Sequence, residues 1–202
     1  MSNVHQVTRD FEAAVAEYTG APYVVACSSC TAAIQGALAW SRFVTGVEAV
    51  SMPRLSYVGV PAAIRNAGMD VSFRDEDWQG EYRLLPTRVY DSARRFTSYM
   101  YRAGAMQCVS FHATKILADS QGGAVLLDNA EAAAWLRRYF FDCRTYGADP
   151  KTDQVLYPSM HGYLSPDIAA RLLWKLQGLP RHNLDLPRSD YPDLSTMEAF
   201  KP

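Results

Sequence analysis

Short apolar runs alternate with segments of helical periodicity along most of the chain, and this alternation limits the fold more than any other sequence feature. Val7, Phe11, Val15 and Tyr18 recur at helical spacing, and a β-branched run follows at residues 23–27. Later apolar runs occupy residues 49–52, 69–73, 88–90, 107–111 and 124–127, with helical segments after residue 29, at 58–66, at 130–141 and after residue 166. The pattern predicts an α/β layer fold with a mostly parallel sheet, in which ligands bind beyond the carboxyl ends of the strands.

Charge and cysteine content exclude several classes of protein. The 202 residues include 20 Lys and Arg and 21 Asp and Glu, a net charge of -1, which does not favour nucleic acid or an anionic membrane as a partner. The sequence predicts neither a transmembrane span nor a signal peptide. Four cysteines are too few for a disulfide scaffold of this length and favour a reducing cytoplasm.

The residues after position 178 differ from the rest of the chain. They read "LPRHNLDLPRSDYPDLSTMEAFKP", which is rich in proline and has no periodicity. We therefore expect an α/β domain at residues 1–178 and a proline-rich extended tail at residues 179–202.

The segment "VVACSSCTAAIQGAL" at residues 24–38 contains a C-x-x-C, formed by Cys27 and Cys30. A zinc site would need further ligands at paired spacing, which the other cysteines and the histidines do not offer. A redox pair is an alternative, because a helix N-terminus lowers a thiol pKa. A third interpretation is that Ser29 caps a helix whose first N–H groups, at Cys30 and Thr31, bind a phosphate. A capped helix without a ligand is equally compatible with this stretch.

Three other polar residues stand where a ligand would bind in such a fold. Lys115 follows a buried strand that contains Ser110, and a desolvated lysine there can form a Schiff base. Asp91 ends another strand, and its carboxylate suits a protonated pyridine nitrogen. Tyr57 is available to stack on an aromatic ring. Each residue also has an ordinary alternative: a solvated lysine, a helix-capping aspartate and a core or surface tyrosine.

Taken together, these segments resemble the DegT–DnrJ–StrS family of PLP-dependent sugar aminotransferases, which have the aspartate-aminotransferase fold. The stretch "SFHATKILADSQGGAVLLDN" is the most specific similarity, because it is close to the family's S-F-x-x-T-K-x-L-x-x-G-E-G-G-A-V-x-T-N. "FEAAVAEYTGAPYVVACSSCTAAIQGAL", "VYDSA" and "GYLSPDIAARL" are similar to three further family motifs. The resemblance extends from about Phe11 to Lys175.

The resemblance implies a cofactor, pyridoxal 5′-phosphate (PLP), and a role for each candidate residue. Lys115 would be the catalytic Schiff-base lysine, and Asp91 the catalytic partner of the pyridine nitrogen. The phosphate would lie against residues that bind it through the helix start and a hydroxyl, which are Ser29, Cys30, Thr31 and Ser110. Tyr57 would stack on the ring, and Arg94 would lie beside its phenolic oxygen. Cys30 stands where the family has glycine, which makes the C-x-x-C accidental, and no metal is expected.

The resemblance also implies a reaction and its setting. Amino transfer would move an amino group from an amino acid, glutamate or glutamine in the family, to a keto or aldehyde acceptor such as a keto sugar on a nucleotide. The enzyme would be a cytoplasmic homodimer. A PLP-dependent decarboxylase or lyase that uses the same residues is an alternative. A degenerate binding or partner subunit is another.

The chain departs from the family pattern in four places. It is much shorter, and a three-layer, minimised large domain without the usual C-terminal domain is expected. A strand–helix unit before Asp91 is missing, and Arg94 replaces the family's Gln or His. The G-Y-N-Y-R segment is shortened to "GYLSPD", which removes an Asn and an Arg. We expect a dimer partner or the proline-rich tail to supply the missing wall of the site.

Overall fold

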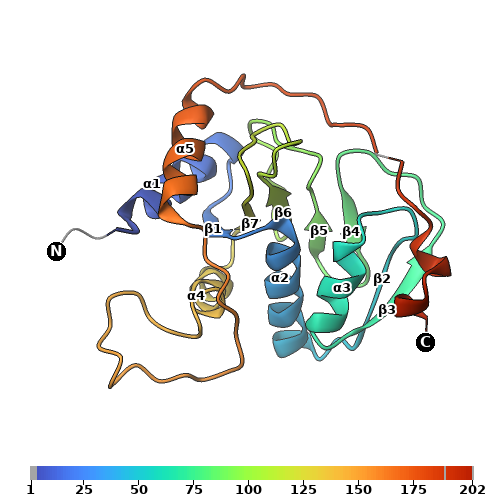
Figure 1. Cartoon of the computed structure of the whole chain (residues 1–202), viewed down its shortest axis with the longest axis horizontal. Coiled ribbons are helices and arrows are strands. Elements are labelled where there is room, and N and C mark those ends of the chain that lie inside the picture. Colours follow the sequence, from blue (N-terminus) through green and yellow to red (C-terminus); the bar gives the residue numbers. More distant parts are fainter. Residues whose placement is uncertain (1–3, 189, 202) are drawn as a thin grey trace.

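The computed structural model describes residues 4–188 and 190–201, and its strands form two sheets (Figure 1). The five-stranded sheet has the order β1-β7-β6-β5-β4. Its strands are β1 (Tyr23–Cys27), β7 (Gly123–Leu127), β6 (Met106–Ser110), β5 (Val89–Asp91) and β4 (Tyr82–Leu84). The second sheet pairs β2 (Ala49–Pro53) with β3 (Asp70–Arg74) in parallel.

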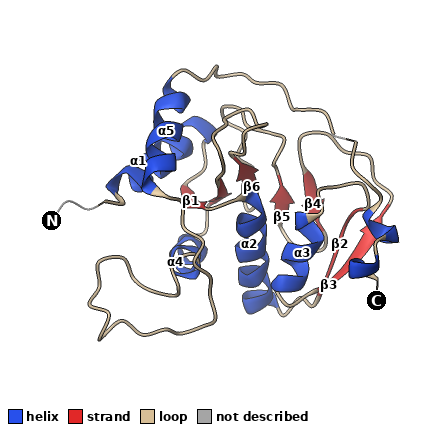
Figure 2. Cartoon of the chain, viewed as in Figure 1, coloured by secondary structure: helices blue, strands red, loops and turns tan. Residues whose placement is uncertain are grey.

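Helices cover both faces of the five-stranded sheet, as Figure 2 shows. One face packs against α2 (Cys30–Thr45), α3 (Gly59–Asn66) and α4 (Ala130–Tyr139). The other packs against α1 (Gln6–Thr19) and α5 (Pro166–Gln177). Along β1 the side chains alternate between these two cores, with Val25 and Cys27 in the first and Val24 and Ala26 in the second. The expected three-layer α/β class is confirmed.

The strand directions require one correction to the expected, mostly parallel sheet. β7 is antiparallel to both β1 and β6, β5 is parallel to β6, and β4 is antiparallel to β5. An antiparallel bridge from Ser51 to Leu85 sets β2, and with it β3, in the direction of β5. β4 and β7 therefore oppose the other strands. The connections from β4 to β5 and from β6 to β7 contain no helix. A strand that runs parallel to the one before it would need a longer crossover connection.

Local signals place most helix ends where the sequence predicts them. The Ser29 hydroxyl caps α2 by accepting a hydrogen bond from the Ala32 N–H, 3.0 Å away. Gly20 ends α1 with a positive φ of 77°. Pro166 occupies the first turn of α5. The helix predicted at 130–141 ends earlier, at Tyr139. Among the strands, the sequence did not predict the short strand β4.

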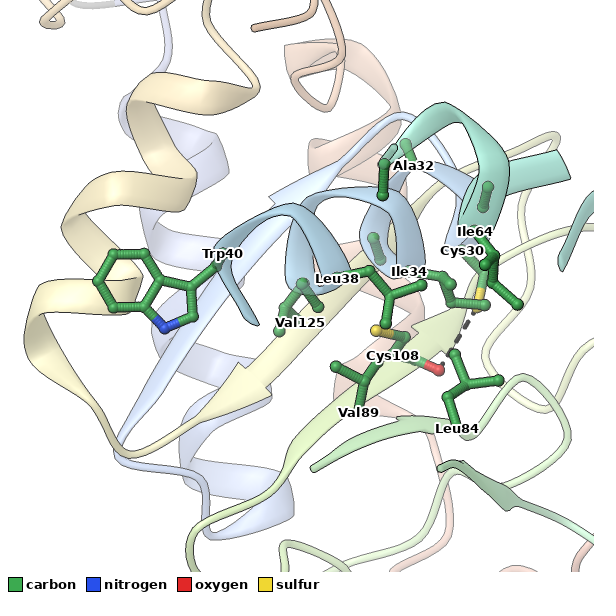
Figure 3. Close-up of a cluster of buried hydrophobic side chains, with 14 of the residues drawn as sticks. Cys30, Ala32, Ile34, Leu38, Trp40, Ile64, Leu84, Val89, Cys108 and Val125 are labelled. Atoms are coloured by element: carbon green, nitrogen blue, oxygen red, sulfur yellow. Dashed lines mark hydrogen bonds between the residues drawn. The ribbon is translucent and has the colours of Figure 1, made fainter. Parts of the chain in front are cut away.

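The larger core fixes α2 against the sheet. Ile34 and Leu38 of α2 lie beside Cys108, Val125 and neighbouring side chains in Figure 3, and all four are at most 1% exposed. Burying a side chain of this size contributes about 1.5–3 kcal/mol. The N-terminus of α2 is therefore held firmly near the carboxyl ends of β5 and β6.

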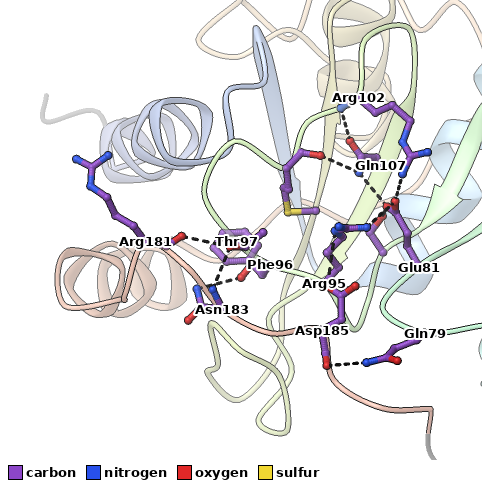
Figure 4. A network of polar contacts seen from close by, with 12 residues as sticks. Gln79, Glu81, Arg95, Phe96, Thr97, Arg102, Gln107, Arg181, Asn183 and Asp185 are labelled. Carbon is purple, nitrogen blue, oxygen red and sulfur yellow. Dashed lines mark hydrogen bonds and ion pairs between the residues drawn. The ribbon is translucent and has the colours of Figure 1, made fainter.

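The proline-rich tail leaves α5 and crosses the end of the sheet toward β2 and β3 (Figure 1). Asn183 anchors its start, because its side-chain amide donates to the Phe96 carbonyl at 3.2 Å (Figure 4). Its far end carries the short 3-10 helices η1 (Leu194–Thr196) and η2 (Glu198–Phe200), and Leu194 is fully buried. The division into domain and tail stays a prediction. Among the residues described, no helix has both the length and the apolar character to cross a membrane.

Candidate active site

A cavity of about 280 Å³ lies between the N-terminus of α2, the ends of β5 and β6, the loop after β6 and the tail. It brings together all eight residues for which the sequence predicts a role in cofactor binding. These are Ser29, Cys30, Thr31, Tyr57, Asp91, Arg94, Ser110 and Lys115. Residues far apart in sequence therefore surround one space, at the lower end of the size range of small-molecule sites. Their individual roles stay predictions.

The helix end of the cavity carries backbone and hydroxyl donors. α2 begins at Cys30, and an α-helix leaves its first N–H groups without partners inside the helix. A Cβ added to Gly123 would lie 2.4 Å from the Ser29 carbonyl carbon and 2.5 Å from the Cys30 nitrogen. Only glycine therefore lets β7 approach the start of α2 this closely. The result is a compact, electropositive corner that suits an anion.

Asp91 forms the deep wall of the cavity, where it is only 5% exposed. Its Oδ1 accepts a hydrogen bond from the Ala93 N–H at 2.9 Å, and its Oδ2 accepts one from the Tyr82 hydroxyl at 2.8 Å. Burial raises the pKa of Asp91 above its usual value, whereas these two hydrogen bonds and the charge of Lys115 act against that rise. The carboxylate is therefore desolvated but partly stabilised.

Lys115 lies in the loop after β6 and is half-buried. Its backbone N–H donates to the His112 carbonyl at 2.9 Å, which holds the turn. Within residues 4–188 and 190–201 its ammonium group makes no hydrogen bond or ion pair, although its charge acts on Asp91 and Cys30. The amine is thus placed at the cavity without a fixed protein partner.

The two cysteines of the C-x-x-C are buried, neutral thiols. Burial raises the pKa of Cys27 to about 12 and that of Cys30 well above its usual value. The Cys30 Sγ donates to the Cys108 carbonyl oxygen at 3.4 Å, as the dashed line in Figure 3 shows. All four cysteines are unpaired. A high pKa disfavours the thiolate that redox exchange or zinc binding requires, so the geometry supports the helix-start interpretation.

Tyr57 and Arg94 lie at the rim of the cavity. Tyr57 is 54% exposed, and its ring packs over Gly59, where an added Cβ would come within 2.7 Å of the ring. The Arg94 guanidinium donates to the Pro187 carbonyl at 2.6 Å and lies 5.7 Å from the centre of the Tyr191 ring. Arg94 therefore attaches the tail to the cavity, a contact that the sequence did not predict.

Sequence reasoning missed several lining residues, among them Ser56, Trp78 and Tyr191, and it missed Tyr82 behind the wall. Tyr82 touches the site through Asp91, and Tyr191 brings the tail into its wall. The only signal for Tyr82 was the two-residue alternation of Tyr82 and Leu84, which is too short to identify a strand. Nothing local pointed to Tyr191.

A family model matches most of the chain. It describes the DegT/DnrJ/EryC1/StrS aminotransferase family and covers residues 2–89 and 98–183. The match agrees with the resemblance found in the sequence motifs. A search of curated proteins finds no match.

Solved structures share the fold at low sequence identity. A DegT DnrJ EryC1 StrS aminotransferase from Brucella abortus is 21% identical with a TM-score of 0.67, over 86% of this chain and 59% of its own. PseC of Helicobacter pylori, an aminotransferase involved in the biosynthesis of pseudoaminic acid, is 17% identical with a TM-score of 0.72, over 87% and 58%. The sugar aminotransferase CalS13 from Micromonospora echinospora is 18% identical with a TM-score of 0.69, over 86% and 60%. The chain thus spans less than two thirds of the length of these structures.

Proposed function

The chain belongs to the DegT/DnrJ/EryC1/StrS aminotransferase family, and we propose that it binds PLP and transfers an amino group from an amino acid to a keto or aldehyde acceptor. Members of this family are PLP-dependent aminotransferases. The observation that carries the proposal is the single cavity that collects all eight predicted cofactor residues.

The chemistry of the donor set fits this cofactor. The start of α2, with hydroxyls from Thr31 and Ser110, offers neutral donors for a phosphate dianion. Asp91 offers an acceptor for a protonated ring nitrogen. Apolar surface from Ile34 and Val60 lines the space between them and suits the ring. Anion donors, an acid and an amine are thus present together around apolar walls.

Each chemical role follows from the position of a side chain in the cavity. Bound PLP would act as an electron sink for charge that develops on the substrate carbon. Lys115 would bind the cofactor aldehyde through Nζ, and the same atom, once released, would take a proton from the substrate carbon and deliver it to the former aldehyde carbon of the cofactor. Asp91 would hold the proton on the ring nitrogen by accepting a hydrogen bond from it.

The substrate and the assembly belong to the same proposal. A sugar acceptor, in the family's usual form a nucleotide-linked keto sugar, is supported by the sugar aminotransferases among the similar folds. A homodimer is supported by exposed apolar side chains at the rim, Tyr57 and Val58, which are 54% and 47% exposed. A cytoplasmic location is supported by the four unpaired thiols.

The test is an absorbance spectrum of the full chain with added PLP. We expect a visible band that borohydride bleaches and that Lys115→Ala removes. Lys151→Ala, a substitution at an exposed loop lysine, is the matched control and should keep the band. A band that persists in Lys115→Ala would contradict the lysine assignment.

Incubation with single amino acids then identifies the reaction. Conversion of the bound cofactor to its aminated form supports amino transfer, whereas release of CO₂ would favour a decarboxylase. If the wild-type chain develops no band with PLP, the proposed function is wrong and a binding or partner subunit is favoured.

A further inference from the structure

Tyr82 is the residue that faces Asp91 across the β4–β5 ladder. The two residues are register partners in this antiparallel pair, so their side chains leave the same face of the sheet. The Tyr82 hydroxyl lies 2.8 Å from Asp91 Oδ2, and its side chain is only 3% exposed. On its other side the same hydroxyl lies 2.6 Å from the Ser56 Oγ, which is also buried.

We propose that Tyr82, itself held by Ser56, is a positioning residue that orients the Asp91 carboxylate toward the cavity and keeps it charged. This proposal extends the proposed function, and the part of its test that measures cofactor binding rests on that function. Tyr82 lies in β4, a strand that the sequence did not reveal. β4 comes just before β5 in the shortened part of the chain.

The direction of the protons supports this role. Asp91 as a carboxylate can only accept, so the Tyr82 hydroxyl donates to it. Tyr82 then has only acceptor capacity left, so Ser56 donates to Tyr82. The Ser56 proton therefore points to the Tyr82 oxygen and the Tyr82 proton to Asp91, and such a chain of donors stabilises the charged form of the acid.

The geometry leaves Asp91 free to bind a ligand. Its Oδ2 is held by Tyr82 and its Oδ1 by the Ala93 N–H, with the Cys30 thiol more distant at 3.9 Å. A carboxylate has about four acceptor positions, so capacity remains on the side that lines the cavity. Neutral donors thus fix the orientation without the competing positive charge that a salt bridge would bring.

Other titratable groups around Asp91 come from several elements. They act on its charge, and one of them, Cys108, is the register partner of Asp91 on the β6 side of β5. They are Cys30 of α2, Cys108 of β6, Lys115 of the loop after β6, and Arg94, which follows β5. The thiols are buried and neutral, so the two cations are the remaining charged influences on Asp91.

The first arm of the test measures the titration of Asp91 in the cofactor-free protein. Carbon-13 NMR of labelled aspartate carboxyls, with Asp91 assigned from Asp91→Asn, gives its pKa directly. Tyr82→Phe should raise this pKa by about one pH unit or more, because a hydrogen bond to a charged group is lost. Ser56→Ala should raise it by less. Tyr90→Phe removes a hydroxyl from the adjacent residue of β5, on the opposite face, and should leave the pKa of Asp91 unchanged.

The second arm measures PLP affinity against pH for the same variants. Tyr82→Phe should weaken binding about tenfold near the pKa of Asp91 and approach the wild type at higher pH, where the acid is ionised in both proteins. A loss that is equal at every pH would indicate a packing defect and overturn the proposal. Unchanged titration of Asp91 in both Tyr82→Phe and Ser56→Ala would also overturn it.

The two arms separate failure of this inference from failure of the proposed function. If Tyr82→Phe does not fold, Ser56→Ala alone decides the first arm, because it removes only one small buried hydroxyl. A shifted Asp91 titration in a protein that binds no PLP would support the positioning role and contradict the proposed function.

Discussion

Asp91 and Glu81 are two buried carboxylates on opposite faces of the same β-hairpin, and they are held in different ways. Tyr82 faces Asp91 across the ladder, whereas Glu81 and Ser92, one residue further along, meet on the other face. The Glu81 carboxylate accepts hydrogen bonds from four side chains. Three of them, Arg95, Arg102 and Gln107, are labelled in Figure 4, and the fourth is Ser92. Because a carboxylate has about four acceptor positions, Glu81 is saturated.

This difference in hydrogen bonding distinguishes an acid that stabilises the fold, Glu81, from an acid that can bind a ligand, Asp91. In the described structure Asp91 has two close, neutral donors and lines the cavity, whereas Glu81 has two arginines and does not line it. A carboxylate with all its positions filled holds the fold together. A carboxylate with spare capacity beside a cavity can accept a further hydrogen bond from a ligand.

The largest expected effect comes from removing the structural acid. Glu81→Ala leaves Arg95 and Gln107 without their common acceptor and should lower the free energy of unfolding by about 3 kcal/mol, measured in urea. Glu17→Ala, at an exposed position of α1, is the control and should change it by less than about 0.5 kcal/mol. Equal effects in the two variants would show that the Glu81 network does not hold the fold.

Asp91→Asn should instead weaken PLP binding without lowering the stability of the fold. We expect PLP affinity to fall about 10- to 100-fold, since a charge-assisted hydrogen bond contributes about 1.5–3 kcal/mol. The cofactor-free protein should be no less stable than the wild type, because a desolvated charge is removed. Fluorescence titration with PLP and urea unfolding measure the two quantities. A large loss of stability together with unchanged affinity would reverse the assignment of the two acids.

The pH dependence of stability should reveal the desolvated acid, Asp91. Burial raises the pKa of Asp91, so between its usual and its raised value the folded protein binds more protons than the unfolded chain. The free energy of unfolding must therefore fall as pH rises through this window, by up to about 1.4 kcal/mol for each pH unit that separates the folded and unfolded pKa values. Glu12 contributes with the same sign, because its pKa is also raised by burial.

The contribution of Asp91 is isolated by comparing the wild type with Asp91→Asn. Urea unfolding at several pH values should give a flatter dependence for the variant. Parallel curves for the two proteins would mean that Asp91 is not the desolvated acid that the structure describes.

The smallest effect is expected at the edge of the Glu81 network. Arg102 is 54% exposed, and Arg95 would keep Glu81 paired without it. Arg102→Ala should therefore lower the free energy of unfolding by less than about 1 kcal/mol. A loss as large as that of Glu81→Ala would indicate that Arg102, not Arg95, is the essential partner.

Much of the fold was predictable because its signals are local. The run at residues 23–27 is apolar and β-branched, and it forms β1 with the predicted bounds. Ser29 and Gly20 mark helix ends through their own backbone or side-chain chemistry. β4 could not be predicted, because three residues carry too little periodicity. Its direction follows from the short connection to β5, which replaces a crossover.

The candidate site was predictable in its membership but not in its supporting contacts. Motif similarity identified eight residues that now surround one cavity. The same reasoning assigned Arg94 to the cofactor and missed its attachment to Pro187. A motif records which residue types recur, whereas a contact between residues 93 positions apart depends on the path of the whole chain.

By itself, the sequence determined the α/β layers, the family and eight of the residues that line the cavity, because hydrophobic periodicity, helix caps and motif spacing act over a few neighbouring positions. Only the tertiary structure decided that Tyr82 and Ser56 hold Asp91, that Glu81 is fully paired, and that Tyr191 of the tail forms part of the wall. These contacts join distant segments, and their geometry exists only once the core has fixed β4, β5 and the tail relative to one another.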